Sequence, residues 1–364
     1  MGFDPVDVLT LDVTVPDAQP DRHNRFYTEL LQEIHAMPGV EAVGAVFLRP
    51  LEHTAIGMDA PILLEGQRTE LQFRDWELNP PVNLESVTPG YFRAIGTRVV
   101  RGRAFTEQDM ERAPRVVIVS EQLALRLWPG QEPIGRRIHA PGGEPNPQGL
   151  PQWASVVGVV EDARYRGIAD PRFDLYVPYR QTPGLLVKHL MVRTTVDPTS
   201  LIGPIRTHAR RLESTALVEK VAMMQDFLGQ AVAPWRFSAS TLGLLSALAL
   251  ALASLGVYAI VSESVIERTR EIGVRVAVGA RPRQIAGLVL RDSLALTTAG
   301  IVIGLAVAVA AGRLLTGLLY EVQPADPLTL TGMAALFAIV STSATLLPVW
   351  RAVRINPLEA LRTE

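Results

Sequence analysis

The chain has 364 residues, a formal net charge of −2 and a mean hydropathy of only +0.19. It contains no cysteine, which excludes disulfide bonds and metal sites with cysteine ligands. Lysine occurs only at Lys188 and Lys220; we interpret this excess of arginine as genome composition and not as a nucleic-acid-binding signal. The averages combine two unlike parts: residues 1–237 have the composition of a soluble domain, and residues 238–364 that of a membrane domain.

The first elements predicted along the chain are a strand, a helix and a second strand. Residues 8–15 alternate between apolar and polar side chains and stop at a proline, a pattern typical of a strand. Residues 22–37 carry apolar side chains at helical spacing, and a Pro-Gly pair ends the helix. A second strand is predicted over residues 40–48. Together these elements predict a β-α-β unit.

Further strands and helices are predicted in the rest of the N-terminal part. Short runs rich in β-branched residues predict strands at 116–119, 155–160, 175–177 and 190–193, and helices are predicted at about 121–128 and 198–212. The Pro/Gly-rich segment 140–149 is predicted to be a loop. Residues 1–237 are therefore expected to fold as an α+β domain.

Three uncharged apolar runs follow, at residues 238–262, 293–312 and 327–350. Because a helix rises about 1.5 Å per residue, roughly 20 apolar residues cross a hydrocarbon core about 30 Å thick. Each run reaches that length. Buried helices of a large soluble protein are the other explanation, but three such runs in succession, with charges confined to their ends, favour a membrane. Residues 238–364 are therefore predicted to form an all-α transmembrane helical domain with three spans.

The distribution of arginine predicts the orientation of these spans. The segment after the first run and the tail after the third carry Arg268, Arg270, Arg275, Arg281, Arg283, Arg291, Arg351, Arg354 and Arg362. Residues 320–326, between the second and third runs, carry no Lys or Arg. The positive-inside rule places the Arg-rich segments in the cytoplasm, and residues 320–326 and the N-terminal domain outside. Arg313, at the outer end of the second run, could snorkel to the interface or make a polar contact inside the bundle.

The N-terminus carries no recognisable export signal. Residues 1–25 lack a basic start followed by an apolar run, so no signal peptide is predicted. The N-terminal domain must nevertheless cross the membrane to lie outside. We therefore expect that a preceding membrane span is missing from this sequence, as in the C-terminal part of a longer protein.

The sequence lacks the common motifs of enzymatic chemistry. It contains no G-x-x-x-x-G-K-[ST] phosphate loop, no H-E-x-x-H pair and no G-x-S-x-G nucleophile elbow. Residues 106–109 could supply a carboxylate pair, but a capped turn or helix start explains them better. The apolar runs carry almost no ionisable groups, which argues against an ion or proton pathway. The chain is therefore expected not to be an enzyme, and no catalytic residue, cofactor or metal site is predicted.

The charged segment between the first two apolar runs is the candidate functional feature. If residues 264–278 are helical, Glu267 and Glu271 lie on one face, at positions i and i+4. A charged helix held at a membrane face by two spans is well placed to exchange motion with a soluble partner. The segment could instead lie on anionic lipid, attracted by about 1 kcal/mol per arginine.

The same segment carries a narrow apolar stripe. Ile272, Val276 and Gly279 fall at positions i, i+4 and i+7 of the predicted helix. Gly279 is a suitable helix terminator, and Pro282 suits the first turn of the next helix. Two helices that meet at this point are therefore predicted.

Two strings in the C-terminal part form a recognisable pair: E-x-x-x-E-I-G-V-R-x-A-V-G-A at 267–280 and R-A-x-R-I-N-P-L-E-A-L-R at 351–362. With the surrounding residues 239–361, they resemble the FtsX-like permease domain of ABC transporters. A plain stop-transfer anchor is the other explanation of the second string.

The N-terminal part carries matching strings of its own. They are V-T-P-G-Y-F-R-A-I-G at 87–96, G-R-A-F at 102–105, I-V-S-E-x-L-A-x-R-L-W-P-G at 118–130, P-I-G-R-R-I at 133–138 and V-V-G-V-V at 156–160. This part resembles the extracytoplasmic core domain of macrolide-exporter (MacB-type) permeases. Within that family the sequence resembles the duplicated orphan permeases of acidobacteria and similar genomes.

The resemblance implies a permease in the bacterial inner (plasma) membrane, multi-pass, with an extracytoplasmic N-terminal domain and a cytoplasmic C-terminus. In the family, four spans flank the outer domain, two permease units assemble over an ATPase dimer, and ATP binding moves the outer domain. The implied partners are a cytoplasmic ABC ATPase subunit, a second permease unit (a second copy or the other half of a longer protein), the lipid bilayer and a further periplasmic protein, and no nucleic acid. This sequence shows three spans instead of four.

The resemblance also implies which residues contact the ATPase. They are Glu267, Arg270, Glu271, Ile272, Gly273, Arg275 and Gly279. The expected function is therefore mechanical coupling of ATP hydrolysis in a partner to the extracytoplasmic domain, in export or efflux. A membrane-tethered binding or sensing module that uses no ATPase is the alternative.

Overall fold

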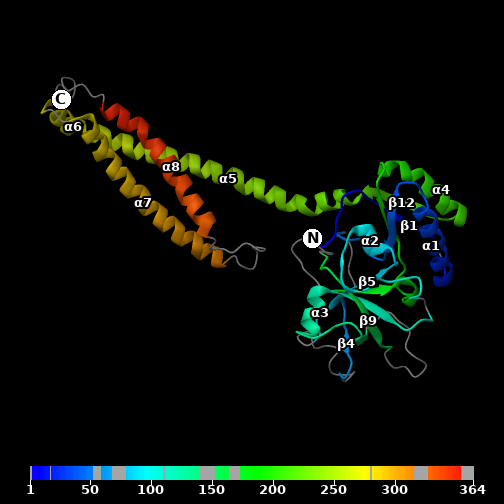
Figure 1. Ribbon diagram of the computed structural model, residues 1–364. Coiled ribbons are helices and arrows are strands. Elements are labelled where there is room, and N and C mark those ends of the chain that lie inside the picture. The colour runs from blue at the N-terminus through cyan, green and yellow to red at the C-terminus, as the bar shows by residue number, and fades with distance from the viewer. Residues whose placement is uncertain are drawn as a thin grey trace. The chain divides into compact units, whose positions relative to one another are not determined.

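The computed structural model describes residues 2–16, 18–51, 59–67, 79–109, 112–139, 152–163, 173–278, 281–314 and 327–353. The chain divides into two compact units, Met1–Pro234 and Trp235–Glu364. The first is a mixed α/β domain and the second is helical, as the sequence predicts for its N- and C-terminal parts (Figure 1). The loop predicted at 140–149 lies outside the described residues.

One half of the N-terminal sheet contains four antiparallel strands. Its elements are β1 (Val8–Thr14), α1 (Pro20–His35), β2 (Val40–Val46), β11 (His189–Thr194), the 3-10 turn η3 (Pro198–Leu201), α4 (Ile202–Leu212) and β12 (Leu217–Met223). The strand order is β12-β1-β11-β2, which is the split β-α-β arrangement of ferredoxin-like folds. The predicted β-α-β unit is therefore present, but β11 lies between its two strands.

Helices α1 and α4 pack together beside these strands (Figure 1). The apolar face of α1 is buried through Phe26, Tyr27, Leu30 and Ile34, as helical spacing predicts. The Tyr27 hydroxyl donates a 2.5 Å hydrogen bond to the carbonyl of Val13, which ties the helix to the strand. The helix begins two residues earlier than predicted because a proline is tolerated in the first turn, where its missing N–H has no intrahelical partner.

The other half of the sheet lies in the sequence between β2 and β11. Its elements are β3 (Asp59–Ala60), β4 (Leu63–Leu64), β5 (Val82–Val87), α2 (Tyr91–Ile95), β6 (Val99–Gly102), β7 (Val116–Ser120), α3 (Glu121–Leu127), β8 (Arg137–His139), β9 (Ala154–Val160), β10 (Phe173–Pro178) and the 3-10 turn η2 (Tyr179–Gln181). The order continues β2-β5-β10-β7-β9-β8-β4, with parallel pairs β5/β10 and β7/β9. A single register pair, Val46 with Val87, joins the two halves.

Helix α2 is pressed directly onto β2. An added Cβ at Gly90 would lie 2.1 Å from the carbonyl oxygen of Val43, and one at Gly44 would lie 2.5 Å from the backbone nitrogen of Tyr91. Only glycine permits this approach, so these two positions set the distance between the two halves at this point.

The described part of the C-terminal unit is helical. Its helices are α5 (Met224–Glu267), which begins in the N-terminal unit, α6 (Thr269–Ala277), α7 (Pro282–Leu314) and α8 (Pro327–Val353). Within the described residues, the helical stretches Arg236–Glu267 and Pro327–Trp350 are long and apolar enough to cross a membrane, whereas the apolar part of α7, Leu294–Ala310, is shorter. The structure therefore gives two candidate spans where the sequence predicts three.

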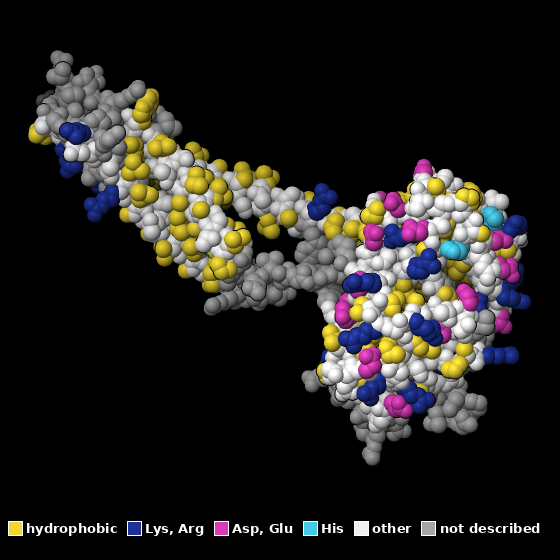
Figure 2. Space-filling view, viewed as in Figure 1, with side chains coloured by type: hydrophobic (Ala, Val, Ile, Leu, Met, Phe, Trp, Pro, Cys, Tyr) yellow, Lys and Arg dark blue, Asp and Glu magenta, His cyan; other side chains and the backbone are white. Residues whose placement is uncertain are grey.

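The surfaces of the long helices α5, α7 and α8 are largely apolar. Leu242, Leu252, Ile303 and Leu328 are each more than 60% exposed. Figure 2 shows apolar side chains along α5, α7 and α8, and charged side chains spread over the N-terminal domain. Helices α7 and α8 pack against each other. Apolar surface of this extent is typical of helices that meet lipid.

Candidate functional site

The charged segment after the first candidate span forms two helices instead of the single helix predicted over 264–278. Helix α5 ends at Glu267, a turn follows at Arg268, and α6 begins at Thr269. The Thr269 hydroxyl donates a 3.0 Å hydrogen bond to the carbonyl of Val265. The same back-bond occurs inside the unbroken helices α1 and α7, from Thr28 and Thr298, so it does not by itself account for the break.

At the end of α5 and within α6, three charged candidate coupling residues are exposed and one apolar residue is buried. Glu267, Glu271 and Arg275 are exposed, and the Arg275 guanidinium lies 2.5 Å from the Glu271 carboxylate, four residues earlier on the same helix. Ile272, the first residue of the predicted stripe, is only 2% exposed.

The other candidate coupling residues are Arg270, Gly273 and Gly279. The backbones of Arg270 and Gly273 lie in α6, whereas Gly279 lies outside the described residues. Pro282 occupies the first position of α7, as predicted. The segment therefore presents an exposed ion pair beside a buried isoleucine.

Residues 106–109, which could supply a carboxylate pair, form a capped turn. The Asp109 carboxylate accepts a 2.8 Å hydrogen bond from the Thr106 backbone N–H and is paired with both terminal nitrogens of Arg103, at 2.7 and 2.9 Å. Burial opposes ionisation, but these partners hold the pKa of Asp109 below its usual range. The turn interpretation is confirmed.

A buried polar cluster lies under the first turns of α5. Asp12 on β1 accepts a 2.6 Å hydrogen bond from Nδ1 of His189 on β11, and Nη1 of Arg49 lies 3.4 Å from the same carboxylate. All three residues are buried, and Arg49 is 1% exposed. Burial raises the pKa of Asp12, but the His189 hydrogen bond and the charges of Arg49 and Lys220 outweigh it, so the pKa lies below its usual range.

Lys220 reaches this cluster through an irregular backbone. Its φ of 45° is in the left-handed region that β-strand residues rarely adopt. The β1/β12 register shifts between Thr10 and Asp12, at the same place. The ammonium lies 3.4 Å from the Asp12 carboxylate. The bulge therefore directs a second cation to Asp12.

The cluster contacts the helix that leads to the first candidate span. The Arg49 guanidinium lies 4.0 Å from the ring centroid of Phe227, in the first turns of α5. Met224, the first residue of α5, is 1% exposed and belongs to the domain core, and Leu228 packs against the same core. The first turns of α5 are therefore held by the N-terminal domain.

Phe227→Leu is expected to loosen these turns. Leucine keeps an apolar side chain but removes the aromatic face, and a desolvated cation–π contact contributes about 1–2 kcal/mol. Backbone amides of residues 224–230 should exchange with solvent deuterons about tenfold faster, measured by hydrogen-exchange mass spectrometry of the full chain. Phe237→Leu is the matched control, because Phe237 is 74% exposed on the same helix. Equal exchange in the two variants would contradict the anchoring role.

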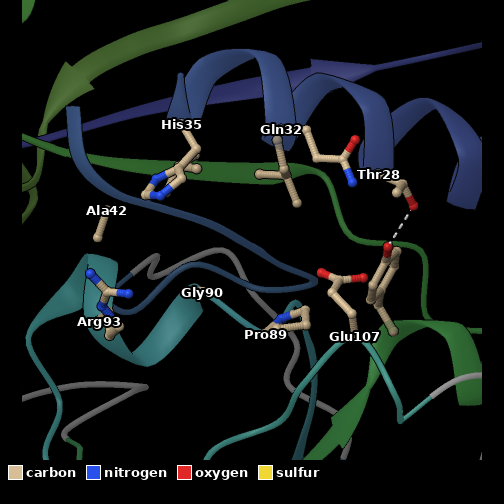
Figure 3. A pocket seen from close by; sticks show the side chains of 11 residues that line it. Thr28, Gln32, His35, Ala42, Pro89, Gly90, Arg93 and Glu107 are labelled. Carbon is tan, nitrogen blue, oxygen red and sulfur yellow. Dashed lines mark hydrogen bonds between the residues drawn. The ribbon is translucent and has the colours of Figure 1, made fainter. Parts of the chain in front are cut away.

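A cavity of about 190 Å³ opens between α1 and α2 (Figure 3). Helix α1 contributes Thr28, Leu31, Gln32 and His35; the remaining lining residues are Ala42, Val43, Pro89, Gly90, Arg93, Glu107 and Tyr179. The floor is β2, and the close approach of Gly90 to that strand brings α2 to its edge. The cavity therefore lies where the two halves of the domain meet.

The two ends of the cavity differ in chemistry. His35 and Arg93 lie at one end, on either side of Ala42 (Figure 3). At the other end, the hydroxyls of Thr28 and Tyr179 are 2.9 Å apart, and Arg180 donates to both, at 2.6 and 2.9 Å. The Arg180 guanidinium also lies 3.3 Å from the Glu107 carboxylate. One end is therefore a satisfied hydrogen-bond network, and the other presents cationic and hydrogen-bonding groups.

Sequence reasoning missed both the polar cluster and the cavity. Thr10 and Asp12 occupy the polar side of an alternating strand, which normally faces solvent, yet they are 0% and 6% exposed. A charged residue within a predicted strand was the available signal for the cluster. The sequence carries no comparable signal for the cavity, because its lining comes from segments far apart in the chain.

Comparisons with known families cover both parts of the chain. Residues 7–221 match the MacB-like periplasmic core domain, and residues 243–357 match the FtsX-like permease C-terminal domain. The first match alone covers more than half of the chain. The two matched regions follow each other in the same order as the two units of the structure.

Curated relatives show the same similarity. A protein of Pseudomonas syringae pv. tomato named "Probable syringafactin export ATP-binding/permease protein" is 29% identical over 314 residues, covering 84% of this chain and 45% of the relative. A macrolide export ATP-binding/permease protein MacB of Hahella chejuensis is 27% identical over 318 residues, covering 84% and 46%. The chain thus spans about half the length of the curated relatives it matches. The crystal structure of the periplasmic region of MacB from Actinobacillus actinomycetemcomitans is 14% identical, with a TM-score of 0.40 over 64% of this chain and 94% of that one.

Proposed function

The chain belongs to the MacB-like periplasmic core domain family and also carries the FtsX-like permease C-terminal domain, and from this premise we propose that it is the non-catalytic permease subunit of an export-type ABC transporter. The presence of both matched regions, in this order in one chain, carries the proposal. The relatives are named as ATP-binding/permease proteins, which supports a cytoplasmic ABC ATPase as the partner. Their names also support export as the direction of transport.

The proposed arrangement places residues 1–237 outside the bacterial inner membrane and residues 238–364 in it. The three apolar runs form three spans. The second run lies in α7, whose apolar part, Leu294–Ala310, is short, but the whole helix has 33 residues and is long enough to cross the membrane. The C-terminus is cytoplasmic. A second permease unit completes the assembly, either a second copy or the other half of a longer protein.

The proposed coupling acts through α5 and α6. Helix α5 is one helix of 44 residues, whose first turns are fixed to the domain core through Met224 and Phe227. Its last residue is followed within two positions by α6, with the exposed Glu271–Arg275 pair. An ATPase that moved α6 would therefore act on a helix with a fixed attachment at its far end. We propose that ATP hydrolysis is coupled to the extracytoplasmic domain in this way.

Cysteine labelling tests the orientation. Since the chain has no native cysteine, single substitutions give an unambiguous result. Gln323→Cys should react with a membrane-impermeant thiol reagent in intact cells whose outer membrane, if present, is permeabilised, whereas Arg275→Cys should react only after cell lysis. The arginine distribution predicts this pattern because positively charged segments stay in the cytoplasm. Labelling of Arg275→Cys but not of Gln323→Cys in intact cells would reverse the proposed topology.

A further inference from the structure

We propose that the cavity between α1 and α2 is a binding site for the carboxylate of a small acylated amino acid, either free or at the C-terminal end of a peptide. This inference concerns the N-terminal domain alone and does not depend on transport. It rests on three features of the cavity: cationic and hydrogen-bonding groups at one end, an apolar middle, and another end whose hydroxyls and Glu107 carboxylate are already paired within the chain.

The charged end of the cavity is suited to a carboxylate. Arg93 is exposed, and neither its guanidinium nor the His35 imidazole makes a hydrogen bond or ion pair with a described part of the chain. The two side chains flank Ala42 (Figure 3), whose small methyl group leaves space between them. A guanidinium offers two parallel N–H donors that match the two oxygens of a carboxylate. Arg93 would therefore form the main contact, with His35 as a second hydrogen-bonding partner.

The middle of the cavity and the Gln32 side chain fit the rest of such a ligand. Leu31, Val43 and Pro89 supply apolar surface for an aliphatic side chain. The Gln32 side chain, on the exposed face of α1, can donate to and accept from an amide. The Thr28 hydroxyl donates to the Asn24 carbonyl and both hydroxyls accept from Arg180, so this end is a preformed wall and the amide contact falls to Gln32. A ligand with one carboxylate, one amide and one branched apolar group therefore uses the charged end, Gln32 and the apolar middle.

The shape of the site is set by the backbone. Since an added Cβ at Gly90 would lie 2.1 Å from the Val43 carbonyl oxygen, α2 and its Arg93 are held at a fixed distance from β2. The site is therefore preformed, which favours binding of a small ligand.

The test uses N-acetyl-L-leucine and N-acetyl-L-leucinamide as probes. The first carries the carboxylate and the second is its neutral counterpart. Ligand-observed NMR titration of the full chain in lipid nanodiscs, with empty nanodiscs as background, should show weak saturable binding of the acid and at least about tenfold weaker binding of the amide, as expected for loss of one charge-assisted hydrogen bond. N-acetyl-Ala-Ala-Leu distinguishes the two sources: competition with the acid supports a peptide end, and lack of competition supports a free small molecule.

Three variants make the test specific. Arg93→Gln should weaken binding of the acid about tenfold and leave the amide unchanged. Gln32→Trp, which adds bulk on an exposed helical position at the mouth, should weaken both probes. Arg206→Gln removes the same charge from an exposed position on α4, away from the cavity, and should have no effect. The proposal is overturned if acid and amide bind equally, or if Arg93→Gln and Arg206→Gln behave alike.

Discussion

In the complete permease complex, Gly273→Trp and Glu271→Lys are each expected to reduce co-purification of the ATPase about tenfold or more and to abolish transport-coupled ATP turnover. Gly273 lies in α6, where the absence of a side chain allows close approach of a partner, and a buried interface contact commonly contributes 2 kcal/mol or more. Glu271→Lys replaces the Glu271–Arg275 attraction with repulsion and reverses the local charge. Both positions lie outside the apolar runs, so insertion should be unchanged.

Matched variants separate the contact from general disturbance of the helix. Gly273→Ala adds one methyl group and improves helix propensity by about 1 kcal/mol, so it should retain the ATPase. Glu263→Lys makes the same charge change at an exposed position of α5 before the segment. The measurement is the amount of ATPase bound to the tagged permease in membranes, with its ATP turnover. Full binding and turnover in both test variants would leave the lipid-surface role of this segment as the explanation.

Replacement of Asp12 by alanine should destabilise the N-terminal domain more than any surface substitution. It removes the carboxylate that pairs with Arg49 and His189, both almost completely buried. Loss of one partner of a buried ion pair costs about 3–5 kcal/mol, because the other charge stays buried and loses its ionic partner. For a domain of this size we expect the unfolding temperature to fall by roughly 10 °C. Glu65→Ala, which removes a pair with Arg137 exposed on both sides, should change it little.

The effect of Asp12 should also depend on pH with a defined sign. The folded-state pKa of Asp12 lies below the ordinary aspartate value of 3.8, so the carboxylate stabilises the fold fully above that value. The stabilisation is lost as the pH falls through the lowered folded-state pKa. Calorimetric unfolding of the full chain should therefore show a constant difference between wild type and Asp12→Ala from neutral pH down to about pH 4, and a shrinking difference below it. A difference that grew on acidification would contradict the assignment.

Local sequence patterns predicted the elements whose stability is local. The helix ended by a Pro-Gly pair became α1, and the β-branched runs became β7, β9, β10 and β11. Periodicity detects these elements because each buries a continuous apolar face. The strands β3, β4, β6 and β8, by contrast, are short, and β12 has no fully buried residue. Their conformation depends on pairing with strands distant in the sequence.

The coupling segment shows the limit of the same reasoning at a single residue. Spacing predicted one helix from 264 to 278, and the buried position of Ile272 agrees with it. The structure instead has a turn at Arg268, between α5 and α6. An interruption of one residue leaves the apolar spacing on both sides unchanged, so periodicity does not reveal it. Whether Glu267 and Glu271 share one face therefore could not be decided from periodicity.

The sequence by itself determined the family and the division into an α+β part and an apolar helical part. It could do so because composition, apolar run length and local motifs are properties of contiguous residues. Only the tertiary structure placed β11 between β1 and β2, and so brought His189 to Asp12 and Arg49. Likewise, only the approach of α2 to β2 at Gly90 placed Arg93 opposite His35. Both sites join residues separated by a long insertion, and such contacts are fixed by strand order and close packing, which local periodicity does not encode.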